Sequence, residues 1–192
     1  DEGIQGVTNK KNKVISEILS KSEPTNVYMG VDIGSVSFKI VLIDEQNRLV
    51  DQLWLRNQGS PIDSTKRGLK KLKENLEKLQ ILEKLNINGV CTTGSARYLI
   101  KSVIGGDLAK TEIIAHAVAS ANEIPDVQTI LEIGGQDSKI IILRNGIVTD
   151  FAMNSVCAAG TGSFLDRQAE RLEIPINELG DYALKSSVPV RI

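Results

Sequence analysis

Two eight-residue stretches decide the fold of this chain: DIGSVSFK at residues 32–39 and EIGGQDSK at residues 132–139. Each stretch begins with an acidic residue and an apolar residue, continues with glycine and ends on lysine. Each lies between two short apolar runs that predict β-strands, and a third predicted strand follows. The six predicted strands are 27–33, 38–44, 48–55, 129–133, 139–144 and 147–151. This repeated order of strand, glycine turn and strands indicates two related lobes.

The remaining segments predict helices and a division into domains. Leucines at steps of three and four predict a long helix over 63–85. Further helices are expected at 96–104, 112–122, 164–172 and 175–185, and further strands at 88–92 and 188–192. Together these elements predict an α/β fold. We expect a tail or linker at 1–27, a first lobe at 28–125 and the start of a second, truncated lobe at 126–192.

Composition excludes several classes of protein. The chain has 192 residues, with 23 Lys and Arg against 24 Asp and Glu, and a formal net charge of −1. Proteins that coat nucleic acid are usually basic, so no nucleic-acid partner is expected. No apolar run approaches the roughly 20 residues that a membrane span needs. The chain begins at Asp1 without an apolar signal stretch, and we therefore expect a cytoplasmic location.

The first glycine turn carries residues that suit a phosphate group. Gly34 lets the backbone approach an anion, Ser35 and Ser37 add hydroxyl donors, and Lys39 adds a positive charge. Asp32, at a strand end, could hold Mg²⁺ through water. The turn joins two strands, whereas a Walker loop or a dinucleotide fingerprint opens a helix. The simpler alternative is a tight hairpin whose aspartate caps the turn.

The second turn repeats this chemistry. Glu132 takes the place of the aspartate, and Gly134 and Gly135 form the turn. Gln136 could orient water or a γ-phosphate, or it could be an ordinary turn residue. Asp137 could assist Mg²⁺ or cap the hairpin. Two such hairpins, one in each lobe, can hold the phosphates of a nucleotide from both sides. The pair therefore indicates a nucleotide site more specifically than either turn does alone.

The pair of turns resembles the two phosphate motifs of the actin-like ATPases. This resemblance implies the actin-like, ribonuclease H-like fold, with ATP and Mg²⁺ as ligands. Glu112 matches the position on the connecting helix where that superfamily often has a carboxylate facing the metal or the attacking water. A surface acid favoured by the start of a helix is the alternative for this residue.

A narrower resemblance covers residues 28–192 and is strongest over 131–166. The turn at 134–139 and the loop Asn154-x-x-Cys-Ala-Ala-Gly-Thr-Gly at 154–162 are similar to the BadF/BadG/BcrA/BcrD-type ATPases. These are activators of 2-hydroxyacyl-CoA dehydratases and ATP-binding subunits of benzoyl-CoA reductases. The resemblance implies an ATPase module that drives electron transfer into an acyl-CoA dehydratase or reductase component. A catalytically degenerate regulatory module and a small-molecule kinase of the same fold are the alternatives.

The family shares one [4Fe-4S] cluster between the two subunits of a homodimer, each giving two cysteines. Cys157 matches one ligand, although a small buried thiol is the simpler alternative. Ala115, before His116, stands where the family has the other cysteine, and Cys91 matches neither position. A dimer would then supply two thiolates where four are usual, so the sequence leaves open whether a cluster binds. The family's Gly-rich adenosine motif has no match here, so we expect a fragment of a longer activase.

Overall fold

The structure is a computed structural model that describes residues 2–57, 59–154 and 161–188. By contacts between Cα atoms it forms two compact units, Asp1–Ala115 and His116–Ile192. These units follow spatial contacts, and the domain limits expected at 27/28 and 125/126 stay a prediction. Among the described residues, no helix is long and apolar enough to cross a membrane.

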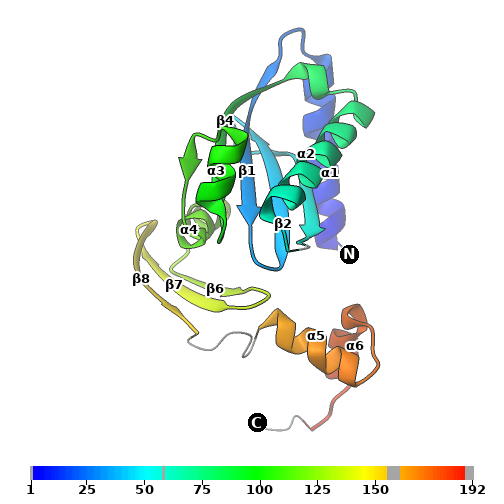
Figure 1. Cartoon of the computed structure of the whole chain (residues 1–192), viewed down its shortest axis with the longest axis vertical. Helices are drawn as coiled ribbons and strands as arrows, with labels where there is room; N and C mark the ends of the chain where they lie inside the picture. Colours follow the sequence, from blue (N-terminus) through cyan, green and yellow to red (C-terminus); the bar gives the residue numbers. More distant parts are fainter. Residues whose placement is uncertain (1, 58, 155–160, 189–192) are drawn as a thin grey trace. The chain divides into compact units, whose positions relative to one another are not determined.

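A five-stranded sheet forms the centre of the first unit (Figure 1). The strands are β1 (Thr25–Ile33), β2 (Ser37–Asp44), β3 (Leu49–Arg56), β4 (Leu85–Thr93) and β5 (Leu108–Ala109). Their order in the sheet is β3-β2-β1-β4-β5. β1, β2 and β3 pair antiparallel, whereas β4 pairs parallel with β1 and β5 parallel with β4. The first three predicted strands are therefore confirmed, and the glycine turn lies between β1 and β2.

The first unit contains four helices among its described residues. They are α1 (Glu2–Ser20), α2 (Pro61–Lys78), the short 3₁₀ helix η1 (Leu82–Lys84) and α3 (Arg97–Ile104), and α4 (Glu112–Glu123) runs from this unit into the second. Ser60 caps α2 by accepting a hydrogen bond from the Asp63 amide at 3.2 Å. The helix predicted over 63–85 was too long, because α2 ends at Lys78 and Gln80 has a positive φ of 58°. That backbone conformation cannot continue an α-helix.

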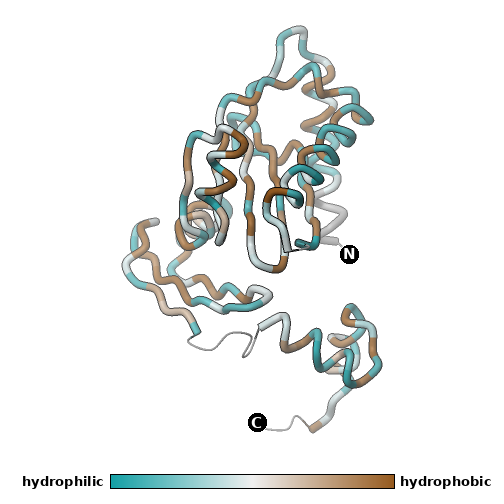
Figure 2. Tube along the Cα trace, viewed as in Figure 1, coloured by the Kyte–Doolittle hydropathy of each residue, from teal (hydrophilic) through white to brown (hydrophobic). Residues whose placement is uncertain are grey.

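The core of the first unit lies on one face of the sheet. Alternate residues of β1 and β2 are buried there, which is the pattern of strands with one covered face. Phe38 packs directly on α2, because a Cβ at Gly68 would lie only 2.0 Å from its ring. α1 buries Val14, Ile15 and Ile18 in the same core. Figure 2 shows the matching pattern, with apolar strands and a largely hydrophilic α2.

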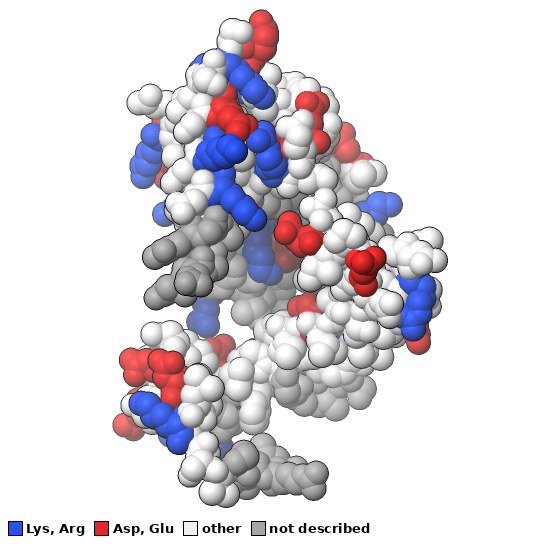
Figure 3. Space-filling view, turned by 180° about the vertical axis from the view of Figure 1, so that it is seen from behind, with Lys and Arg blue, Asp and Glu red and all other residues white. Residues whose placement is uncertain are grey.

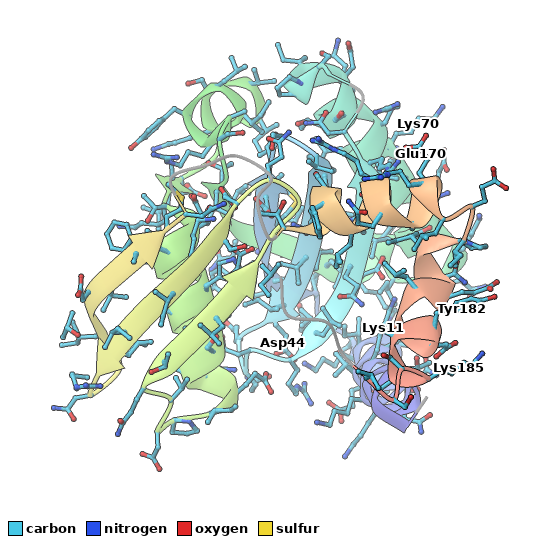
Figure 4. The ribbon with its side chains drawn as sticks, turned by 90° about the horizontal axis from the view of Figure 1, so that it is seen from below. Lys11, Asp44, Lys70, Glu170, Tyr182 and Lys185 are labelled. Atoms are coloured by element: carbon cyan, nitrogen blue, oxygen red, sulfur yellow. The ribbon has the colours of Figure 1, made fainter. Side chains whose placement is uncertain are left out.

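α1 is also held by charged side chains. Lys11 pairs with the buried carboxylate of Asp51 on β3. Arg48 binds Glu17 of α1 at 2.7 Å and Asp44 of β2 at 2.8 Å. These two carboxylates raise the pKa of Arg48 through their hydrogen bonds, Glu17 first. Figure 4 labels Lys11 and Asp44 near this helix. α1 is therefore fixed to the sheet by apolar packing and by ion pairs.

The second unit contains a smaller sheet and a helical segment. β6 (Thr129–Ile133), β7 (Ser138–Arg144) and β8 (Ile147–Met153) pair antiparallel in the order β6-β7-β8. Asn145 and Gly146 have φ values of 51° and 75°, which makes the tight hairpin turn expected of this dipeptide. α5 (Gly162–Arg171), η2 (Ile176–Glu178) and α6 (Leu179–Leu184) follow. The helix predicted at 175–185 is thus split, and most of the strand predicted at 188–192 lies outside the described residues.

Candidate functional site

The first glycine turn is closed by its own backbone. The Gly34 amide donates to the Ser37 carbonyl at 3.0 Å. This bond makes a tight turn that places the exposed Ser35 at its tip. Lys39 lies opposite Asp32 in the β1–β2 ladder, and its Nζ lies 2.8 Å from Asp32 Oδ2. The turn and the strand ends beside it therefore bring together the five residues that were predicted to bind phosphate and Mg²⁺ here: Asp32, Gly34, Ser35, Ser37 and Lys39.

The Asp32 carboxylate lies beside a glycine of a neighbouring loop. Gly94 follows β4 and has a φ of +87°. A Cβ at Gly94 would lie 2.4 Å from the Ile33 carbonyl oxygen and 2.7 Å from Asp32 Oδ1. Ser95 Oγ donates to the same Ile33 carbonyl at 3.2 Å. The absence of a Cβ at position 94 thus lets this loop pack closely on Asp32. The Asp32 side chain is still 30% exposed, so its carboxylate is open to water, and this fits a carboxylate that holds a hydrated cation.

The second turn has the same backbone geometry. The Gly134 amide donates to the Asp137 carbonyl at 2.8 Å, as Gly34 donates to Ser37. Lys139 lies opposite Glu132 in the β6–β7 ladder, as Lys39 lies opposite Asp32. The repeat of the two eight-residue stretches is therefore a repeat of turn, register and ion pair.

The lysine of the second turn is more buried than that of the first. The Lys139 side chain is 3% exposed, against 50% for Lys39. Its Nζ lies 2.8 Å from Asp137 Oδ1 and 3.2 Å from Glu132 Oε2. Burial alone would lower the pKa of Lys139, but hydrogen bonds to Asp137 and Glu132 outweigh burial and leave this pKa raised. Lys139 thus stays charged at neutral pH and keeps both carboxylates paired.

The start of α5 holds the second turn in place. The amides of Gly162 and Ser163 donate to the carbonyls of Gly134 and Gly135, each at 2.9 Å. The Thr161 hydroxyl donates to Gly135 at 3.1 Å, and the Ser163 hydroxyl also donates to that carbonyl. A further hydrogen bond of 2.9 Å runs from the Ser138 amide to Asn154 Oδ1.

Sequence reasoning assigned no role to these supporting side chains. Asn154 and Thr161 belong to the 154–162 motif, so that motif is the sequence pattern that could have indicated their role. Ser163 and Asn57, which contacts the first turn, lie outside every motif considered.

The remaining predicted site residues have separate positions. Gln136 is exposed in the second turn. Glu112 is the first residue of α4 and is half-buried, with Ala115 and His116 in the next turn of the helix. The two glycine turns belong to different compact units. Cys157 lies outside the described residues.

The described residues hold no group of three or more histidines, cysteines or acidic residues that could bind a metal ion. Cys91 is the free cysteine among them, half-buried on β4, with its Sγ 3.9 Å from the Thr92 carbonyl. One thiol inside a strand does not fit a four-cysteine cluster, and Cys157, which matches a cluster ligand, is not among the described residues. Lys and Arg are interspersed with Asp and Glu on the face that Figure 3 shows.

Comparison with known proteins identifies the family. The model of the BadF/BadG/BcrA/BcrD ATPase family matches residues 29–191. The chain belongs to this family. The (R)-2-hydroxyglutaryl-CoA dehydratase activating ATPase of Acidaminococcus fermentans is 32% identical over 164 residues, which cover 85% of this chain and 60% of that protein. The resemblance expected from the two turns and the 154–162 loop is confirmed.

Solved structures agree with the fold. The activator of 2-hydroxyisocaproyl-CoA dehydratase from Clostridium difficile, solved with bound ADPNP, has a TM-score of 0.75 and 34% identity. The match covers 86% of this chain and 59% of that one. An ethanolamine utilization protein of Carboxydothermus hydrogenoformans has a TM-score of 0.57 at 18% identity, which concerns the fold alone. The α/β actin-like fold is confirmed, and the chain spans about 60% of the curated relative's length.

Proposed function

We propose that this chain is the ATP-binding and ATP-hydrolysing module of an activase that drives ATP-dependent electron transfer into an acyl-CoA dehydratase or reductase component. The observation that carries the proposal is the pair of glycine turns with the same backbone bond and the same acid–lysine register. Two relatives of this family act as activators of 2-hydroxyacyl-CoA dehydratases, and one of these was solved with an ATP analogue.

The two turns hold the phosphates in this proposal. The amides and hydroxyls at Ser35 and Ser37, with Lys39, contact one side, and Gly134 and Gly135 contact the other. Phosphoryl transfer needs positioning and charge neutralisation from the protein, and it needs no covalent chemistry from it. The groups of the two turns supply both the positioning and the charge. Glu112 orients the attacking water, and Gln136 orients that water or the γ-phosphate. Closure of the two lobes on the nucleotide is the signal that the partner protein detects.

The metal ion is part of the same proposal. Asp32, whose side chain is 30% exposed, would hold Mg²⁺ through water, and Asp137 would assist from the second turn. Mg²⁺ neutralises charge on the phosphate oxygens when it is bound.

Cys157 is the candidate ligand of an iron–sulfur cluster at a homodimer interface. We also expect the protein to be cytoplasmic.

The test is activation of a cognate dehydratase. The protein at its natural length, ATP and a low-potential reductant are mixed anaerobically with candidate dehydratase components, and substrate dehydration is followed. ATP-dependent activation that is lost in Lys39→Met supports the proposal. Lys73→Met is the matched control, because Lys73 is an exposed lysine on α2. Nucleotide binding without hydrolysis or activation would favour the degenerate regulatory module, and phosphate transfer to a sugar would favour the kinase.

A further inference from the structure

Asn57 holds the first glycine turn from outside it. This residue follows β3, and its backbone amide donates to the Val36 carbonyl at 2.8 Å. Its side-chain Nδ2 donates to the Gly34 carbonyl at 2.9 Å. One residue thus makes two hydrogen bonds to a turn that lies more than 20 residues earlier in the chain, 23 residues in the case of Gly34.

The side chain of Asn57 is itself fixed by α2. Ser64 Oγ donates to Asn57 Oδ1 at 2.7 Å, and Ser64 is fully buried. Arg67 donates to the Ser64 hydroxyl at 3.2 Å. Both ends of the Asn57 amide are therefore used, one toward α2 and one toward the turn. A residue held at both ends has a defined orientation, which it can impose on its partner.

The equivalent carbonyl of the second turn accepts its hydrogen bond from a different kind of group. Gly134 is the equivalent of Gly34, and its carbonyl accepts from the Gly162 amide at 2.9 Å. In the first turn the Asn57 side chain makes the corresponding bond at 2.9 Å. A side-chain amide in one unit thus replaces the backbone amide of a helix start in the other.

Holding this carbonyl also sets the direction of the next amide. The peptide unit is planar and trans, so its N–H points opposite to its C=O. A Gly34 carbonyl turned toward Asn57 therefore turns the Ser35 N–H away from Asn57. Ser35 is exposed, and its N–H is one of the donors assigned to phosphate above.

We propose that Asn57 is a positioning residue, held by Ser64 of α2, that orients the Gly34–Ser35 peptide for phosphate binding. This inference rests on the proposed nucleotide-binding function. It adds a residue outside the two turns to the machinery that sets nucleotide affinity, and it links α2 to the first turn.

The test compares ADPNP binding and hydrogen exchange in variants of the protein at its natural length. Asn57→Ala removes the hydrogen bond to the Gly34 carbonyl, so it should weaken ADPNP binding about three- to tenfold and speed amide exchange at residues 34–37. Asn57→Asp keeps the acceptor for Ser64 but loses the donor and adds negative charge, so its binding should be weaker still. The KM for ATP should rise in Asn57→Ala, with a smaller change in kcat. Asn86→Ala is the control, because Asn86 makes its 3.0 Å hydrogen bond to Asn26, where β1 begins.

A double-mutant cycle tests the link to α2. Ser64→Ala should weaken ADPNP binding, and Asn57→Ala with Ser64→Ala together should be no weaker than Asn57→Ala alone. ADPNP binding and turn exchange at wild-type levels in Asn57→Ala would overturn the inference, and an unchanged Ser64→Ala would overturn the link to α2. If the wild-type protein itself fails to bind ADPNP, the proposed function fails, whereas unchanged exchange at residues 34–37 in Asn57→Ala would refute the positioning role separately.

Discussion

Lys139 lies directly opposite Glu132 across the β6–β7 ladder, with its Nζ 3.2 Å from the Glu132 carboxylate. Lys39 has the same relationship to Asp32 in the first unit, at 2.8 Å. The two pairs differ in burial, because the Lys139 side chain is 3% exposed and the Lys39 side chain 50%. The pair in the second unit should therefore affect stability, and the pair in the first unit should chiefly affect ligand binding.

Replacing Lys139 should destabilise the second unit. Lys139→Met leaves the Glu132 carboxylate, 18% exposed, without its charged partner. Leaving such a group unsatisfied costs about 2–3 kcal/mol of the free energy of unfolding, which chemical denaturation measures. Lys39→Met is the matched control and should cost less than about 1 kcal/mol, since its ion pair is largely exposed. Equal losses in the two variants would contradict this difference in burial.

The raised pKa of Lys139 predicts a dependence of stability on alkaline pH. A pKa that is higher in the folded than in the unfolded state favours folding while the lysine is protonated. The contribution is fully present below the unfolded value of about 10.5 and is lost as the pH rises through the higher folded pKa. Unfolding measured from neutral to strongly alkaline pH should show this loss in wild type. The Lys139→Met protein should lack this component, and an identical pH profile would contradict the assignment.

An added methyl group at Gly94 should disturb Asp32. The Cβ of Gly94→Ala would lie 2.4 Å from the Ile33 carbonyl oxygen and 2.7 Å from Asp32 Oδ1, at a φ of +87°. We expect a loss of about 2 kcal/mol or more in stability and loss of Mg²⁺-dependent nucleotide binding. Gly105→Ala is the control, because its φ is +66° but no atom lies within 4 Å of the added Cβ. It should cost about 1 kcal/mol and leave nucleotide binding intact.

Truncation of Ile18 tests whether α1 contributes to the core of the first unit. Ile18 is 2% exposed, so Ile18→Ala should lower the free energy of unfolding by about 3 kcal/mol. The neighbouring Leu19 is 40% exposed, and Leu19→Ala should cost about 0.5 kcal/mol or less. Thermal or denaturant unfolding of both variants measures the difference. Equal, small effects would mean that α1 does not pack on the sheet in solution.

The sequence predicted the strands well because their physical signals are local. Alternating burial along β2 and the Asn145-Gly146 turn are both readable from a few consecutive residues. The end of α2 was missed because it depends on the positive φ of Gln80, a residue that rarely adopts this conformation. Only a tail or linker was expected at 1–27, because local periodicity cannot show that the sheet covers Val14, Ile15 and Ile18.

The site was only partly predictable for a similar reason. The residues of each turn are consecutive, so the sequence grouped them correctly, although their roles stay a prediction. The groups that hold the turns come from elsewhere in the chain. Asn57 lies 23 residues after Gly34, and Gly162 contacts Gly134 from the start of α5. A pattern of neighbouring residues does not predict such long-range hydrogen bonds.

The measurement that tests the central claim most directly is the affinity of the natural-length protein for ATP, ADP, AMP and adenosine with Mg²⁺, by calorimetry. If the two turns bind phosphates, affinity falls in that order, and Lys39→Met weakens ATP binding while Lys73→Met does not. Trp54, the one tryptophan of the chain, pairs in register with Lys39 and offers a fluorescence readout of the same titration. Adenosine binding as tightly as ATP, or no binding of ATP, would contradict the account.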